Sequence, residues 1–147
     1  MIIIRNAEPS DIEALLPLLE QLGYPTSKKL LEKRFAKFLS NEGYGVAVAC
    51  TNSKIVGFVA WSQSNLFVAD KIRIHIEGIA VDKNYRGQNI GKQLMHFVEN
   101  HAQKSSPAII YLTSGLRRAN EGTHEFYKKL GYKNEGLMAK LYLRKEV

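Results

Sequence analysis

The segment VDKNYRGQNIGKQL, residues 81–94, decides how this chain folds. Just before the loop, residues 72–81 read IRIHIEGIAV, and their pattern predicts the longest strand of the chain. Beyond the loop, residues from about 90 to 103 are predicted to form a helix. The segment is therefore expected to carry the chain from the end of a strand, through a turn with small residues, into the start of a helix.

The residues of this loop are those of an anion site. The first N–H groups of a helix have no partner within the helix and carry a partial positive charge, so they attract phosphate. Gly87 and Gly91 lack side chains, which lets backbone approach an anion closely, and Arg86 and Lys92 add formal charge. We therefore expect the loop to bind phosphate.

Two better-known phosphate loops do not fit this segment. The P-loop consensus requires glycine where this chain has Arg86 and a hydroxyl side chain where it has Gln93. The dinucleotide fingerprint G-x-G-x-x-G is absent from the sequence. The sequence therefore argues against a nucleotide hydrolase.

The remainder of the chain alternates predicted strands with predicted helices. The element order is βααβββαβαβ, which predicts an α/β (α+β) domain with a mixed central sheet and helices on its faces. The other strands are expected at 2–7, 45–50, 55–61, 108–113 and about 137–143, and a further helix at about 120–130.

Two helices are predicted before the second strand. Ser10 is expected to cap the first, with Glu13 reaching back, and Pro17 to kink or divide it. The second helix is expected at about 27–40. Its side chains expected to face the core are Leu31, Phe35, Phe38 and Leu39.

Strand parity sorts the side chains of residues 72–81 into two faces. It places Ile72, Ile74 and Ile76 on one face and His75, Glu77, Ile79 and Val81 on the other. Gly78 predicts either a bulge or the close approach of a ligand.

Two motifs of the chain together resemble the GNAT acetyltransferases. The loop is similar to their pyrophosphate motif, [QR]-x-x-G-x-[GA], with Arg86 and Gly91 at its ends and Asn89 in the place of the first glycine. Asparagine is the residue besides glycine that best tolerates a left-handed backbone. About 30 residues later, Asn120 and the run FYKKLGY at 126–132 resemble N-x-x-A-x-x-F-Y-x-K-x-G-[FY], with threonine in the place of alanine. The resemblance runs from the opening helix to Tyr132, and the length of 147 residues with no evident linker predicts one domain over 1–147.

The resemblance implies acetyl-CoA as co-substrate. The edge of the 72–81 strand would hydrogen-bond the pantetheine arm, and the loop would hold the pyrophosphate through its backbone N–H groups. Asn120 and Tyr127 belong to the same expected site, while the basic loop at 113–118 either binds the 3′-phosphate or faces solvent. The strand and loop residues implied are Ile79, Ala80, Val81, Arg86, Gly87, Gln88, Asn89, Ile90, Gly91 and Lys92.

Acetyl transfer to an amine sets clear chemical demands. A lysine-like amine is neutral in only about one part in a thousand at pH 7, so deprotonation adds roughly 4–5 kcal/mol to the barrier unless a base removes the proton. Glu77, His75 and water are the competing candidates for that base; alternatively, Glu77 pairs with Arg73 or a lysine and His75 is structural. By the resemblance, Tyr127 protonates the leaving thiolate during direct attack; the alternative is a core aromatic.

The same residues predict no metal centre. The chain has one cysteine, Cys50, and His96, His101 and His124 do not form a ligand pattern, since the first two lie five residues apart on one predicted helix.

The composition leaves two other classes of function to weigh. The chain carries a net charge of +7, which attracts polyanions and raises nucleic-acid binding as an alternative, although no recognisable nucleic-acid-binding motif is present. The other alternative is a non-catalytic sensor domain of the same fold that binds acyl-CoA. With no signal peptide or apolar span in the sequence, a cytoplasmic location is expected.

The acceptor amine stays open at this level. Its site is expected to come from residues 23–44 and 62–71, with Tyr24, Tyr44, Trp61 and Phe67 either lining it or lying in the core. An antibiotic, a polyamine, an amino acid and a protein are all candidates, although the basic surface argues against a polycation. A homodimer through the apolar run 137–143 is a further expectation.

Overall fold

A computed structural model describes residues 1–113, 122–134 and 143–147 of the chain. The chain forms two compact units, Met1–Ile110 and Tyr111–Val147. A single domain over 1–147 therefore stays a prediction, and the two units are taken in turn.

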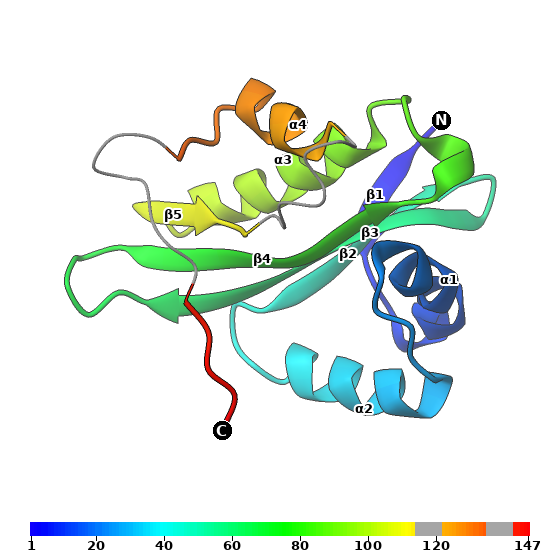
Figure 1. The fold of residues 1–147 in the computed structure, drawn as a ribbon, viewed down its shortest axis with the longest axis horizontal. Coiled ribbons are helices and arrows are strands. Elements are labelled where there is room, and N and C mark those ends of the chain that lie inside the picture. The colour runs from blue at the N-terminus through cyan, green and yellow to red at the C-terminus, as the bar shows by residue number, and fades with distance from the viewer. Residues whose placement is uncertain (114–121, 135–142) are drawn as a thin grey trace. The chain divides into compact units, whose positions relative to one another are not determined.

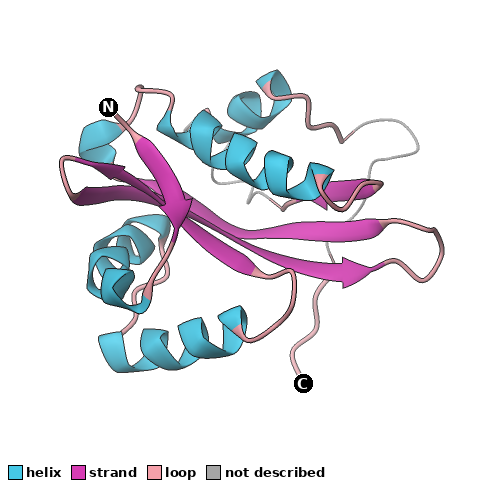
Figure 2. Ribbon diagram, turned by 180° about the vertical axis from the view of Figure 1, so that it is seen from behind, coloured by secondary structure: helices cyan, strands magenta, loops and turns pink. Residues whose placement is uncertain are grey.

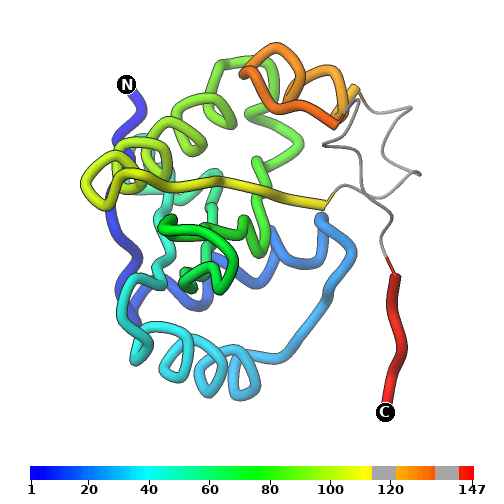
Figure 3. The backbone as a smooth tube through the Cα atoms, turned by 90° about the vertical axis from the view of Figure 1, so that its left-hand side faces the viewer, coloured from blue at the N-terminus to red at the C-terminus, as the bar shows by residue number. Residues whose placement is uncertain are grey.

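The first unit is a sheet with helices on both faces. The strands follow one another across the sheet in chain order, and the first four pair antiparallel with one another. α1 (Ile12–Leu22) and α2 (Lys28–Leu39) cover one face, and α3 (Ile90–Gln103) covers the other (Figures 1 and 2). Figure 3 shows α2 and α3 on opposite sides of the strands. The strands are β1 (Ile3–Asn6), β2 (Gly45–Thr51), β3 (Lys54–Asn65), β4 (Ile72–Val81) and β5 (Ala108–Tyr111).

The predicted mixed α/β architecture is therefore confirmed. α3 has the predicted bounds, and the turn between β2 and β3 has positive φ at Asn52 (48°) and Ser53 (65°), as a tight two-residue hairpin requires. The predicted strand at 137–143 falls almost entirely in residues 135–142, outside the described residues.

The start of α1 differs from the prediction. Instead of a cap by Ser10, a short 3-10 turn over Pro9–Asp11 leads into the helix. The backbone N–H of Glu8 donates to the Asp11 carboxylate at 2.7 Å, and Arg5 pairs with the same carboxylate at 2.8 Å. The Asp11 carboxylate thus accepts a backbone hydrogen bond ahead of the 3-10 turn and pairs with Arg5, while the start of α1 itself has no side-chain cap.

Pro17 does not divide α1, which runs unbroken from Ile12 to Leu22. Proline removes one helical hydrogen bond, but Ile12, Leu15 and Leu18 are buried on the inner side of the helix and hold it on the sheet.

α2 begins as its sequence predicts, but the face that it turns to the core is narrower than the predicted one. The Ser27 hydroxyl accepts from the Leu30 N–H at 3.3 Å. Phe35 is buried, but Leu39 is 40% exposed, so its predicted inward position is wrong. Leu39 lies about 100° around the helix from Phe38, which turns it off the apolar stripe.

The sheet has a different core on each face. On the α1/α2 face, the β2 and β3 side chains pack against those of the helices; the buried cluster is Ile12, Leu15, Leu18, Phe35, Val46, Val48 and Phe58. On the α3 face, small β2 residues make room for Trp61, and α3 buries Ile90, Leu94, Met95, Val98 and Ala102.

Gly57 brings the first turn of α3 close to β3. A Cβ at this position would lie 3.1 Å from the backbone oxygen of Ala80, 3.3 Å from Leu94 and 3.4 Å from Ile90. The absent side chain therefore helps to fix where the loop before α3 ends.

β4 carries a bulge at Glu77. Trp61 of β3 pairs with Ile76, yet the preceding β3 residue, Ala60, pairs with Gly78. Glu77 is thus one extra residue on β4, which confirms the bulge that was one of the two alternatives drawn from Gly78.

The bulge corrects the predicted faces of β4. Beyond it the alternation restarts, so Ile79 pairs with Val59 and Val81 pairs with Gly57. Cross-strand partners share a face, and Gly57 lies against α3. Ile79 and Val81 therefore face α3, on the opposite side of the sheet from His75, because uninterrupted parity does not survive an inserted residue.

The second unit contains α4 (Thr123–Lys129). Gly131 follows the C-cap with a φ of 96°, and its N–H donates to the Lys128 carbonyl at 3.0 Å. The helix therefore ends at a left-handed glycine, with cations in its last turn.

Candidate active site

The loop between β4 and α3 is fixed at its start by backbone bonds. The Asp82 N–H donates to the Val56 carbonyl at 2.8 Å, which ties the end of β4 to β3. The Asp82 carboxylate then accepts from the Asn84 N–H at 2.9 Å, and its carbonyl accepts from the Tyr85 N–H at 2.8 Å. The chain thus enters the loop through an ordered turn.

The end of the loop exposes backbone donors. Asn89, directly before α3, has φ 63° and ψ 17°, the left-handed conformation that its position in the motif predicts. Within the described part of the chain, no backbone N–H of residues 86–92 donates to a protein acceptor. The space beside Gly87 is open, with no atom within 4 Å of where its Cβ would lie.

Positive charge surrounds these donors. Arg86 is exposed, and its Nε–H donates to the Val81 carbonyl at 3.2 Å, so the side chain stays beside the end of β4. Lys92 is exposed on the first turn of α3. Backbone donors, a helix start and two cations form a site that fits a phosphate or pyrophosphate group.

The predicted pantetheine edge, Ile79–Val81, lies at the end of β4 that reaches past β5. β5 has four residues, and the Ile72 N–H donates to the Pro107 carbonyl, so β5 begins beside the start of β4 (Figure 1). Among the described residues, β3 alone pairs with Ile79–Val81. The backbone on the other edge of this segment fits an extended ligand that forms hydrogen bonds to a strand.

His75 and Glu77 lie in direct contact. His75 Nδ1 is 2.7 Å from Glu77 Oε2, and the Ser62 hydroxyl donates to the same oxygen at 2.6 Å. The His75 side chain is 28% exposed and that of Glu77 is 39% exposed, so solvent reaches both. Among the described residues, the Glu77 carboxylate thus contacts His75 and Ser62 rather than Arg73 or a lysine. Sequence reasoning missed Ser62, since only the β3–β4 register brings it there.

Tyr127 lies on α4 among other aromatic rings. Its ring meets Phe126 at 5.1 Å and Tyr132 at 6.1 Å between centroids, both edge to face. Its carbonyl accepts from the Tyr132 N–H at 3.1 Å. Asn120 and the arginines at 117 and 118 lie outside the described residues.

The aromatic residues considered for the acceptor site separate by burial. Trp61 is 3% exposed, its indole N–H donates to the Gly43 carbonyl at 3.0 Å, and its ring lies 5.3 Å from that of His101 at a tilt of 47°. Trp61 is therefore a core residue. Tyr24 is 61% exposed, Phe67 is fully exposed, and Tyr44 packs edge to face on Phe38.

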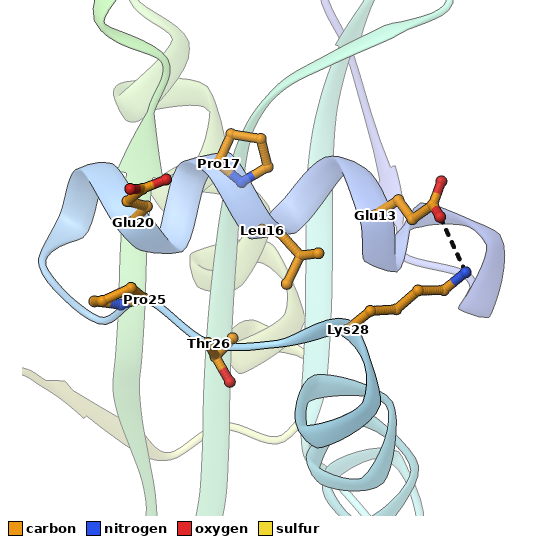
Figure 4. Close-up of a pocket in the computed structure, with 7 residues that line it drawn as sticks. All are labelled: Glu13, Leu16, Pro17, Glu20, Pro25, Thr26 and Lys28. Carbon is orange, nitrogen blue, oxygen red and sulfur yellow. Dashed lines mark hydrogen bonds and ion pairs between the residues drawn. The ribbon is translucent and has the colours of Figure 1, made fainter.

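Two surface cavities include residues of the segments expected to contribute to the acceptor site. One, of about 570 Å³, lies between the outer side of α1 and residues 25–28, where Lys28 pairs with Glu13 at 3.0 Å (Figure 4). The other, of about 350 Å³, lies between the β3–β4 connection and residues 105–107. Neither includes a residue of the loop before α3.

The part of the chain that the structure describes holds no cluster of three side chains suited to a metal ion. His96 pairs with Glu99 one turn away on α3, at 3.7 Å. None of the helices described is long and apolar enough to cross a bilayer.

Comparison with known proteins assigns the family. Residues 12–132 match the model of the acetyltransferase (GNAT) family. The chain belongs to this family. It is 30% identical over 139 residues to an uncharacterised N-acetyltransferase of Methanocaldococcus jannaschii, covering 90% of this chain and spanning 61% of that relative's length. It is 27% identical over 132 residues to the aminoalkylphosphonate N-acetyltransferase of Salmonella typhimurium, covering 88% of this chain and 84% of the relative.

A solved structure is similar in fold to this GNAT chain. An aminoglycoside N-acetyltransferase in complex with CoA superposes with a TM-score of 0.82 over 100% of this chain and 96% of its own. At 16% identity this likeness concerns the fold.

Proposed function

We propose that this GNAT chain transfers an acetyl group from acetyl-CoA to a primary amine of a small molecule or a protein, by direct attack of the amine. The observation that carries the proposal is the set of backbone N–H groups at 86–92 that donate to no acceptor in the described part of the chain. Asn89, in the left-handed conformation, lies among them, and Arg86 and Lys92 lie at the two ends. Family membership and the CoA-bound relative of the same fold support acetyl-CoA as the anionic ligand.

In this proposal each end of the co-substrate meets a different part of the chain. The pyrophosphate receives hydrogen bonds from the loop and charge from Arg86. The pantetheine arm extends along Ile79–Val81, whose backbone groups supply strand-like hydrogen bonds. Asn120 and Tyr127 complete the cofactor contacts, as the family motif implies.

Two proton transfers accompany the reaction. A base in the His75–Glu77 pair takes a proton from the acceptor ammonium, so that its nitrogen can attack the thioester carbonyl carbon. Tyr127 gives a proton to the departing thiolate. Each transfer is worth about 10²-fold or more in rate when the group is well placed.

For the acceptor we propose an amine that also carries a negative charge. The exposed side of α2 carries three lysines spaced about one helical turn apart, Lys29, Lys33 and Lys37. None of them forms an ion pair with a described residue. Like charges at this spacing repel. The row lies in the segment expected to contribute to the acceptor site, and the aminoalkylphosphonate enzyme among the relatives acts, by its name, on an anionic amine.

The test is release of CoA thiol from acetyl-CoA in the presence of a matched panel of amines. An aminoalkylphosphonate, its uncharged alkylamine counterpart and a polyamine differ mainly in charge. The proposal expects turnover that is fastest with the phosphonate. Saturable acetyl-CoA binding without turnover on any amine, peptides included, would favour a non-catalytic sensor and overturn the proposal. Faster turnover of the polyamine would overturn the proposed acceptor alone.

A cytoplasmic location and a homodimer through residues 137–143 remain predictions. Neither enters the proposed chemistry.

A further inference from the structure

On the α1/α2 face of the sheet, the side chains of Ser62 and His75 both contact one carboxylate oxygen of Glu77. Glu77 Oε2 accepts from the Ser62 hydroxyl at 2.6 Å and lies 2.7 Å from His75 Nδ1. Both distances are short for neutral partners and suit hydrogen bonds to a charged acceptor.

The strand register explains why the three meet. Ser62 and His75 are direct cross-strand partners, so their side chains leave the sheet side by side. Glu77 is the bulged residue, with no partner of its own on β3. The bulge frees its backbone from the ladder and lets the carboxylate turn back over the pair.

This geometry determines which nitrogen of a neutral His75 carries the proton. A carboxylate is an acceptor only, so the nitrogen that faces it, Nδ1, must be the donor. In a neutral imidazole the other nitrogen, Nε2, then holds the lone pair.

We propose that Ser62 and Glu77 hold His75 as the proton acceptor of the acetyl transfer, with Nε2 as the accepting atom. Glu77 fixes the tautomer and the ring, and Ser62 fixes Glu77 by occupying the second bonding direction of Oε2. Ser62 is a positioning residue, since it acts through Glu77. This inference rests on the proposed function and decides between the two candidate bases.

The protons balance as follows. The acceptor ammonium gives one proton to His75 Nε2, and the resulting imidazolium keeps its Nδ1–H on Glu77. The neutral amine forms the new C–N bond as the C–S bond breaks. The second proton lost by the nitrogen matches the one gained by the thiolate, with Tyr127 as the proposed donor to sulfur. His75 returns its proton to solvent, so the net products are an amide, CoA thiol and one proton.

The first test does not depend on activity. Nitrogen-15 NMR of the ring nitrogens of His75 reports which nitrogen of the neutral ring is protonated. The inference expects the Nδ1–H form to predominate in the wild type and to lose its predominance in Glu77→Gln, whose amide can donate as well as accept. A wild-type ring protonated mainly on Nε2 would overturn the inference, whatever the catalytic activity.

The second test compares turnover. His75→Gln is expected to lower kcat by about 10²-fold, the usual contribution of a general base. Ser62→Ala is expected to lower kcat by about tenfold, from the loss of a hydrogen bond to a charged group, with little change in KM for acetyl-CoA. Ser62→Thr keeps the hydroxyl and should restore most of the rate. Ser10→Ala, at an exposed serine whose side chain caps nothing, is the matched control.

The outcomes separate this inference from the proposed function. If His75→Gln, folded by its melting curve, keeps more than half of wild-type kcat, Glu77 or water is the base and the inference is wrong. If Ser62→Ala and Ser62→Thr lose rate equally, the hydroxyl is not what positions Glu77. A wild type inactive on all amines would refute the proposed function, while the tautomer measurement still judges the arrangement of the three side chains.

Discussion

Asn89 gives a quantitative test of the loop that starts α3. Its φ of 63° and ψ of 17° place it in the left-handed region, where the family motif has glycine. An ordinary side chain such as alanine pays about 1–2 kcal/mol to enter this region, asparagine pays less, and glycine pays almost nothing. Asn89→Ala should therefore lower the free energy of unfolding by about 1 kcal/mol. Glycine also makes the unfolded chain more flexible, which lowers the free energy of unfolding by about 0.5–1 kcal/mol. These two effects oppose each other, so the stability of Asn89→Gly should stay close to that of the wild type.

Chemical denaturation and thermal melting measure the difference. For a chain of this size, 1 kcal/mol corresponds to a Tm change of about 2–4 °C. Gln88→Ala is the control, because this neighbour is exposed and has no positive φ. Calorimetric titration with acetyl-CoA should show weaker binding for Asn89→Ala than for Asn89→Gly, since relaxing the strain turns the loop donors away from their common direction. Equal stability and equal affinity of the alanine and glycine variants would refute the left-handed loop as the basis of the site.

Three further predictions concern the core, the N-terminal ion pair and the acid. Gly45→Ala should destabilise the fold by about 1–3 kcal/mol in urea unfolding, because the new Cβ would lie 2.3 Å from the Trp61 ring; equal stability would contradict this packing. The hydrogen bond from Arg5 holds the pKa of the Asp11 carboxyl below its ordinary value of 3.8. Asp11→Asn should therefore lower the free energy of unfolding by roughly 1–2 kcal/mol at neutral pH. The difference in unfolding free energy between wild type and variant should shrink as pH falls through the lowered pKa, and a difference that grows in acid would contradict the prediction. Tyr127→Phe should reduce kcat about 10²-fold per folded molecule with little change in KM for acetyl-CoA, and retention of more than half of kcat would exclude Tyr127 as the acid.

The loop before α3 could be predicted from the sequence because its determinants are local. Glycines, cations and an asparagine at fixed spacing specify a helix start with open donors, and α3 begins at Ile90 as expected. The β2–β3 hairpin is local in the same sense, since two residues of a short polar turn adopt positive φ.

The arrangement around Glu77 could not be predicted in the same way. Gly78 indicated irregularity, but the position of the extra residue depends on how β4 aligns with β3, which is a long-range property. That alignment reverses the faces of Ile79 and Val81 and brings Ser62 to Glu77. The start of α1 has a similar cause, because Asp11 pairs with Arg5 of β1, which lies outside the helix.

The central claim is that the loop at the start of α3 binds the pyrophosphate of acetyl-CoA, and titration calorimetry on wild type and Gly91→Asp tests it most directly. The substitution places a carboxylate among the donors that the phosphates need. Saturable binding by the wild type that is lost in a folded Gly91→Asp variant is the expected result. Binding by the variant within threefold of the wild-type affinity, or no binding by the wild type at millimolar acetyl-CoA, would contradict the claim.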